Sequence, residues 1–207
     1  MHIKIDIKIF AFLILFCITR QIEIYVLLMI FAILHELGHL VAGMCLKLKP
    51  KKIELNPFGL SVTFEGIGSN FKANTQVNKI LIAIAGPFVN LICVILAFVL
   101  PIGEISTSVV YSNLILMLVN LIPVYPLDGG RILKCVLHMK FGYFEACKMT
   151  NKISNFIVIL LTMGASLMIF YFENIAILLI IGYLILLTIQ ENRRFRIIEK
   201  TYEVIYR

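Results

Sequence analysis

Residues 24–46 read IYVLLMIFAIL-HELGH-LVAGMCL, and this stretch decides the fold. It is an apolar run long enough to cross a membrane, with three ionisable side chains at its centre and no other charge in either flank. Ionisable residues at membrane depth are costly and are usually functional. The stretch therefore predicts a transmembrane helix that carries a polar functional site.

The composition of the whole chain also indicates a membrane protein. Of its 207 residues, 60% are apolar, and the mean hydropathy is +0.97. Such values exclude an ordinary soluble domain. We expect an all-α polytopic membrane protein, and its apolar runs predict about six transmembrane helices, near 7–21, 22–46, 78–100, 107–125, 153–172 and 174–190.

The charge distribution supports this topology. If both termini are cytoplasmic, every Lys and Arg except Arg20 falls on the cytoplasmic side, as the positive-inside rule requires. The net charge of +7 is then a topology signal. Membrane lipid is an expected partner, whereas nucleic acid is not, because no basic face of a soluble domain remains.

The HELGH motif at 35–39 has the spacing of a zinc site. On a helix, His35 and His39 project from one face one turn apart, so two imidazoles can bind one zinc ion. Glu36 beside them can act as the catalytic base toward a water on the metal, whose pKa zinc lowers to about 7. A chance occurrence would leave three ionisable side chains unpaired in lipid, which disfavours it. We expect one Zn²⁺ per chain.

Asp128 is the preferred third ligand. The chain has only one other aspartate, Asp6. Asp128 lies in the segment NLIPVYPLDGG, where two prolines break the helix and Gly129-Gly130 allow a sharp turn. Broken helices at membrane depth are tolerated where they line a cavity, so a carboxylate here can reach a metal. The alternative is an ordinary Asp-Gly turn at the membrane surface.

A short membrane-associated β-hairpin is expected after the second span. The sequence IELNPFGLSVTFE at 53–65 predicts two strands around a turn at 56–59, because apolar and polar residues alternate in its second half. Such a hairpin can accept an extended substrate as an added strand, with Pro57, Phe58 and Gly59 as substrate-binding candidates. Alternatively, it only lies on the bilayer.

Two asparagines are further substrate-binding candidates. Asn90 in the third span can polarise the scissile carbonyl or, equally, bond across helices. Asn120 has a similar setting, and its expected role is to order the Asp128 segment.

These motifs resemble the site-2 protease family of intramembrane zinc metalloproteases, peptidase family M50. The resemblance implies His35, His39 and Asp128 as zinc ligands and Glu36 as catalytic base. The sequence AGPFVN at 85–90 resembles a further element of that family. The implied reaction is hydrolysis of a peptide bond in a membrane-associated protein near the cytoplasmic face.

With its sequence YPLDGGR at 125–131 and its compact size, the chain most resembles the stage IV sporulation protein FB type of this family. That likeness implies a sporulation pro-sigma factor as substrate, a small membrane inhibitor protein as partner, and a location in the mother-cell membrane around the forespore. We expect a protease domain at 1–190 and a short basic cytoplasmic tail at 191–207, with no CBS or PDZ domain. The tail predicts an amphipathic helix that binds anionic lipid or docks a partner.

Two other interpretations stay open. A membrane zinc transporter would also place histidine and carboxylate in a helix bundle, but it should show polar ligands through several spans. An inactive membrane scaffold could keep the zinc site for stability, although the intact Glu36 argues against it.

Overall fold

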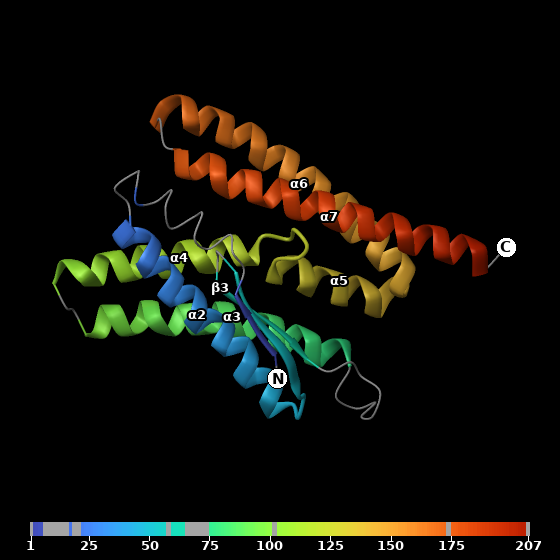
Figure 1. The fold of residues 1–207 in the computed structure, drawn as a ribbon, viewed down its shortest axis with the longest axis horizontal. Helices are drawn as coiled ribbons and strands as arrows, with labels where there is room; N and C mark the ends of the chain where they lie inside the picture. The colour runs from blue at the N-terminus through green and yellow to red at the C-terminus, as the bar shows by residue number, and fades with distance from the viewer. Residues whose placement is uncertain are drawn as a thin grey trace. The chain divides into compact units, whose positions relative to one another are not determined.

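The computed structural model describes residues 2–5, 17, 22–56, 59–64, 75–100, 103–172 and 175–205, and these are predominantly helical (Figure 1). The chain divides into two compact units, Met1–Asn120 and Leu121–Arg207. Each unit is described by itself.

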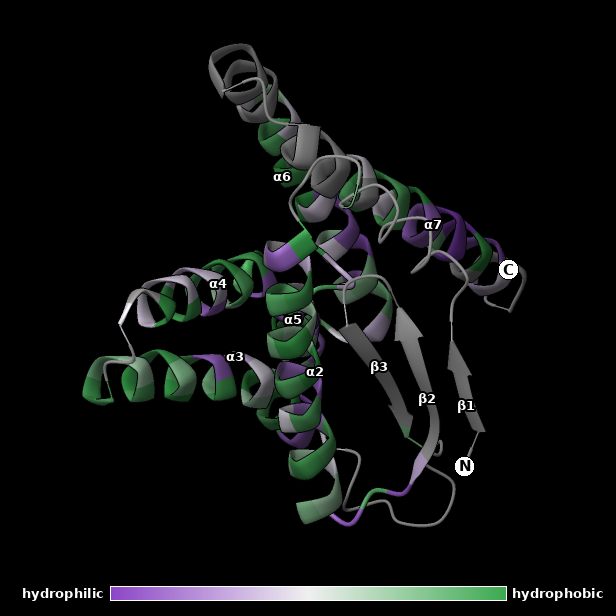
Figure 2. Cartoon of the chain, turned by 60° about the vertical axis from the view of Figure 1, so that its left-hand side comes forward, coloured by the Kyte–Doolittle hydropathy of each residue, from purple (hydrophilic) through white to green (hydrophobic). Residues whose placement is uncertain are grey.

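Two long apolar helices pack against each other in the first unit. Helix α2 runs over Ile22–Cys45 and helix α3 over Gln76–Val99. Helix α3 begins after Thr75, whose hydroxyl accepts a hydrogen bond from the Asn78 amide at 3.3 Å and so satisfies one of the free N–H groups of the first turn. A third helix, α4, covers Glu104–Leu121. Figure 2 shows how strongly hydrophobic residues dominate α3.

A three-stranded sheet accompanies these helices. Strand β1 (His2–Ile5) pairs in parallel with β2 (Pro50–Asn56), and β2 pairs antiparallel with β3 (Gly59–Phe64). Strand β3 contacts α2, where Phe64 fills the space that a side chain at Gly43 would need. The predicted turn residues Pro57 and Phe58 lie outside the described residues, and the membrane association of β2 and β3 stays a prediction. The parallel strand β1 was not predicted.

The described residues of the second unit form three helices. Helix α5 (Asp128–Phe141) packs on α6 (Tyr143–Phe172), and α6 packs along α7 (Ile175–Ile205), as Figure 1 shows. Phe144 near the start of α6 stacks on Tyr202 near the end of α7, with ring centroids 4.3 Å apart. The two helices are therefore antiparallel neighbours.

The predicted spans match the helices to different degrees. In the part of the chain that the structure describes, two helical segments, Tyr25–Cys45 and Gln76–Val99, are long and apolar enough to cross a membrane, and Ile105–Leu121 is shorter. The span predicted at 153–172 falls within α6, and α7 covers the span predicted at 174–190 from Ile175 onward; α6 begins before its span and α7 ends after its own. Apart from Cys17, the first predicted span lies outside the described residues, so the total of six stays a prediction.

The boundary expected at 190 does not coincide with a helix end. Helix α7 continues from its apolar first half into the basic tail. The predicted tail helix is thus the second half of α7, and the division into protease domain and tail stays a prediction.

Candidate metal site

The imidazoles of His35 and His39 converge on one point beside α2. Their Nε2 atoms are 3.2 Å apart, and the rings meet edge to face with centroids 4.8 Å apart. Each side chain is only 3% exposed. The helical spacing of four residues therefore brings two nitrogen donors together in a buried place, as the sequence predicts.

The other ring nitrogen of His39 is fixed by a backbone carbonyl. Its Nδ1 lies 2.7 Å from the carbonyl oxygen of Ile82 on α3. A carbonyl can only accept, so Nδ1 carries the proton and Nε2 keeps its lone pair for a ligand role. This is the arrangement in which metal-binding histidines are usually held. This contact could not be predicted from the sequence, because it joins residues 43 positions apart.

Helix α3 approaches the two imidazoles closely because residue 86 is a glycine. A Cβ built on Gly86 would lie 2.5 Å from Nε2 of His39 and 2.6 Å from Nε2 of His35. Only hydrogen fits there. The AGPFVN element thus has a steric role beside the site, and α3 continues through Pro87 without ending.

A second glycine sets the distance between the helices. A Cβ on Gly38 would lie 2.8 Å from the carbonyl oxygen of Ala85 and 2.7 Å from a methyl group of Val89. Ala85 directly precedes Gly86, so the close packing at Gly38 and the close approach to the histidines belong to one contact between α2 and α3.

The histidine pair fits tetrahedral zinc. Two ligand nitrogens about 2.05 Å from zinc at a tetrahedral angle stand about 3.3 Å apart. The observed separation of 3.2 Å is close to this value. With Nδ1 of His39 protonated, Nε2 of His39 can point its lone pair at an ion, and Nε2 of His35 can do the same in the matching tautomer. Glu36 follows His35 directly and is half-buried, which suits a base that must meet water.

Asp128 lies in the second unit, as the first residue of α5. Its side chain is buried, at 3% exposure, and its carboxylate pairs with the guanidinium of Arg131 at 3.5 Å. A carboxylate in the first helical turn is also stabilised by the helix dipole. Burial of this charge at a helix start agrees with a functional carboxylate.

The role predicted for the two glycines after Asp128 needs correction. They do not form a sharp turn, since Gly129 and Gly130 lie in the first turn of α5. A Cβ on Gly129 would overlap the carbonyl of Leu121, and one on Gly130 would overlap the backbone at Val124 and Tyr125. The glycines are needed for close backbone contact with the preceding segment.

The substrate-binding candidates fall in different settings. Asn90 lies on α3 one turn after Gly86, on the same face, and is fully buried. Among the described residues, its amide has no hydrogen-bond partner. Asn120 instead donates to the carbonyl of Leu116 within α4 at 3.0 Å. Gly59 opens β3 opposite Asn56. The substrate role of all three, and of Pro57 and Phe58, stays a prediction.

Comparison with known proteins finds a family whose members are similar to this chain. The model of peptidase family M50 matches residues 23–108 and 102–164. Zinc metalloprotease MJ0392 of Methanocaldococcus jannaschii is 32% identical over 146 residues, which cover 67% of this chain and 41% of the relative. Stage IV sporulation protein FB of Bacillus subtilis is 26% identical over 144 residues, which cover 66% of this chain and 48% of the relative. The chain thus spans less than half the length of these curated relatives.

A solved structure is similar over most of its length. The structure of a site-2 protease from Methanocaldococcus jannaschii superposes with a TM-score of 0.71 at 26% identity. The alignment covers 91% of this chain and 89% of that one.

Proposed function

Because this chain belongs to peptidase family M50, we propose that it is a zinc metalloendopeptidase that cleaves a membrane-associated protein near the cytoplasmic face of the membrane. The observation that carries the proposal is the buried pair of Nε2 atoms at tetrahedral ligand spacing. The site-2 protease likeness in both sequence and fold supports the same activity. The apolar helices α2 and α3 support a place in the membrane, and both termini are cytoplasmic in this proposal.

The metal is held by three residues in this proposal. His35 and His39 supply two nitrogens, and the buried carboxylate of Asp128 is the third ligand, which leaves one position for water. Zinc supplies Lewis acidity and lowers the pKa of a water ligand to about 7. The hydrogen bond from His39 to Ile82 keeps the ring in the ligating tautomer.

Glu36 moves the proton. It adjoins the first ligand on α2, and its half-buried carboxylate can accept a proton from the attacking water and deliver it to the leaving amine. Asn90 can donate its amide hydrogens to the carbonyl oxygen of the scissile bond, whose negative charge grows in the transition state. Its buried amide, without a partner among the described residues, supports this role.

In this proposal the substrate binds as an additional strand at the edge of the sheet. A helical peptide bond is hydrogen-bonded internally, so cleavage needs an extended segment. Strand β3 pairs with β2 on one side only among the described strands, and its other edge can pair with an extended chain. The turn residues 57–59 and Asn120 complete the proposed substrate-binding set.

The likeness to stage IV sporulation protein FB favours a pro-sigma factor as substrate, a small membrane inhibitor as partner and the mother-cell membrane as location. The direct test is co-expression of the full chain with a candidate membrane-associated pro-sigma factor. Wild type should shorten the substrate, and Glu36→Gln should reduce cleavage by about 10²-fold or more while retaining zinc.

Zinc content separates the possible failures of this test. His35→Ala should lose both zinc and cleavage, whereas Glu36→Gln should lose cleavage alone. Full cleavage by Glu36→Gln would refute the proposed base. Zinc-dependent cleavage of other membrane substrates, but not of the pro-sigma factor, would refute only the sporulation assignment.

A further inference from the structure

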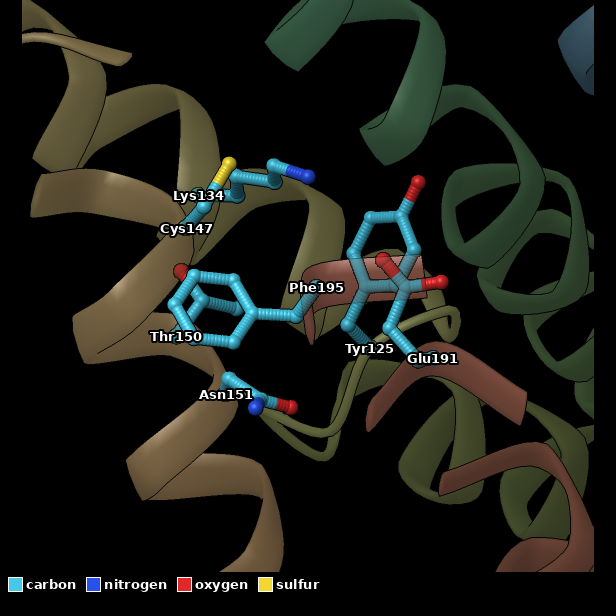
Figure 3. Close-up of a pocket in the computed structure, with 7 residues that line it drawn as sticks. All are labelled: Tyr125, Lys134, Cys147, Thr150, Asn151, Glu191 and Phe195. Atoms are coloured by element: carbon cyan, nitrogen blue, oxygen red, sulfur yellow. The ribbon is translucent and has the colours of Figure 1, made fainter. Parts of the chain in front are cut away.

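A small pocket with polar and aromatic lining residues lies in the second unit beside the segment that leads to Asp128. Its lining comes from that segment and from three helices, α5, α6 and α7 (Figure 3). The seven lining residues are Tyr125, Lys134, Cys147, Thr150, Asn151, Glu191 and Phe195. The pocket encloses about 10 Å³, room for about one water molecule. The side chains around it are therefore tightly confined.

Lys134 is the one cationic residue among the seven that line this pocket. Its Nζ lies 4.6 Å from the centre of the Tyr125 ring and 5.7 Å from that of Tyr143, both within cation–π range. Burial disfavours the charged ammonium, but the surrounding Tyr125, Cys147, Tyr143 and Glu191 outweigh it and raise the pKa of Lys134. Lys134 is thus a charged, partly desolvated cation against an aromatic face.

Tyr125 is where this cation meets the segment before Asp128. The Tyr125 amide donates to the hydroxyl of Ser154 on α6 at 3.0 Å, and the amide of Leu127 donates to the Val124 carbonyl at 2.8 Å. Pro126 has no amide hydrogen to offer. The backbone of the segment also packs closely on Gly129 and Gly130, and the Tyr125 ring under Lys134 adds a side-chain contact with α5.

We propose that Lys134 is a positioning residue for the metal site: its ammonium holds the Tyr125 ring and thereby fixes segment 125–128 and the carboxylate of Asp128. This inference rests on the proposed function, in which Asp128 binds zinc. Glu191 and Phe195 of α7 close the same pocket, so the far half of α7 takes part in the same positioning.

The test measures zinc affinity of the full-length protein in detergent, by competition with a chelator of known affinity. Lys134→Met keeps the length of the side chain and removes its charge, and it should weaken zinc binding by at least about 3-fold and up to about 30-fold. Lys134→Arg restores a cation over the ring and should stay within about 2-fold of wild type. The matched control is Lys140→Met, an exposed lysine of the same helix, which should bind zinc like wild type.

Unfolding of the metal-free protein separates positioning from general packing. Metal-free Lys134→Met should lose less free energy of unfolding than it loses in free energy of zinc binding. An equal loss of metal-free stability and zinc affinity would overturn the inference, and so would wild-type zinc affinity in Lys134→Met. If Lys134→Met does not fold, Tyr125→Leu should weaken zinc binding and Tyr125→Phe should not, and equal affinity of these two variants would overturn it.

Asp128→Asn distinguishes this inference from the proposed function. Wild-type zinc affinity in Asp128→Asn would refute Asp128 as a ligand, and the positioning role with it. Weaker binding in Asp128→Asn together with unchanged binding in Lys134→Met would refute the positioning role alone.

Discussion

The Nε2 atoms of His35 and His39 lie 3.2 Å apart, and the backbone of Gly86 closes the side of the pair that faces α3. The position of α3 thus depends on the absence of a single side chain. Helix α3 also supplies the Ile82 carbonyl that orients His39. The distance between α2 and α3 therefore controls both the space beside the two imidazoles and the tautomer of His39.

Gly86→Ala should therefore impair zinc binding. The new methyl group would overlap both Nε2 atoms, and overpacking of this kind costs about 1–3 kcal/mol, or about 5- to 150-fold in zinc affinity. Zinc content after dialysis against a chelator measures the effect. Gly164→Ala on α6 is the control, since a Cβ there meets nothing within 4 Å. Equal zinc retention by the two variants would contradict the steric role of Gly86.

Gly38→Ala should lower stability even though alanine is the better helix former by about 1 kcal/mol. Its Cβ would press on the Ala85 carbonyl and on Val89, so α2 and α3 must separate. The measurement is the thermal unfolding midpoint in detergent. Adding Val89→Ala should restore only part of the loss, because the Ala85 backbone remains in place. Complete restoration would show that the backbone contact is unimportant.

Asn90→Leu should separate stability from activity. Leucine has the same branching and the same number of side-chain heavy atoms, and it removes a buried amide that has no partner among the described residues, which relieves about 1–3 kcal/mol. The unfolding midpoint should therefore rise. Cleavage should fall by about 10²- to 10³-fold if the amide stabilises the transition state.

The matched control for Asn90 is Asn113→Leu. Asn113 is equally buried, but its amide donates to the Val109 carbonyl of its own helix α4 at 2.8 Å. This variant should keep its cleavage rate. Undiminished cleavage by Asn90→Leu would remove Asn90 from the substrate-binding set.

Phe144→Ala should loosen the contact between the start of α6 and the end of α7. Phe144 stacks on Tyr202 at 4.3 Å, and an aromatic pair contributes about 0.5–1.5 kcal/mol beyond its buried area. Hydrogen exchange of the last turns of α7 should then become faster. Phe156→Ala on α6 is the control, because Phe156 is 68% exposed. Unchanged exchange in Phe144→Ala would contradict a stabilising role of the stack.

The histidine pair and the helices around it could be predicted from sequence because they depend on local spacing. Apolar length marks α2 and α3, and the four-residue interval places His35 and His39 on one face. Membership in the site-2 protease family confirms the family resemblance that these motifs suggested. The ligand and base roles of the individual residues stay predictions.

Other features could not be predicted because they depend on contacts between distant segments. Strand β1 is only four residues long and is defined by its parallel pairing with β2, some 50 positions away. The start of α5 was also missed, because Gly129-Gly130 are typical of a turn and poor helix formers. Their close contact with the preceding backbone explains the glycines and overrides that preference.

Helix α7 is longer than the hydrocarbon core of a bilayer is thick. Its 31 residues span about 46 Å at 1.5 Å per residue, whereas the hydrocarbon core of a bilayer is about 30 Å thick. If the span predicted at 174–190 is embedded, the charged half of α7 extends beyond the hydrocarbon core, and Glu191 and Phe195 of the Lys134 pocket lie at the start of that half. The same helix then joins the predicted membrane span to the side chains around Lys134.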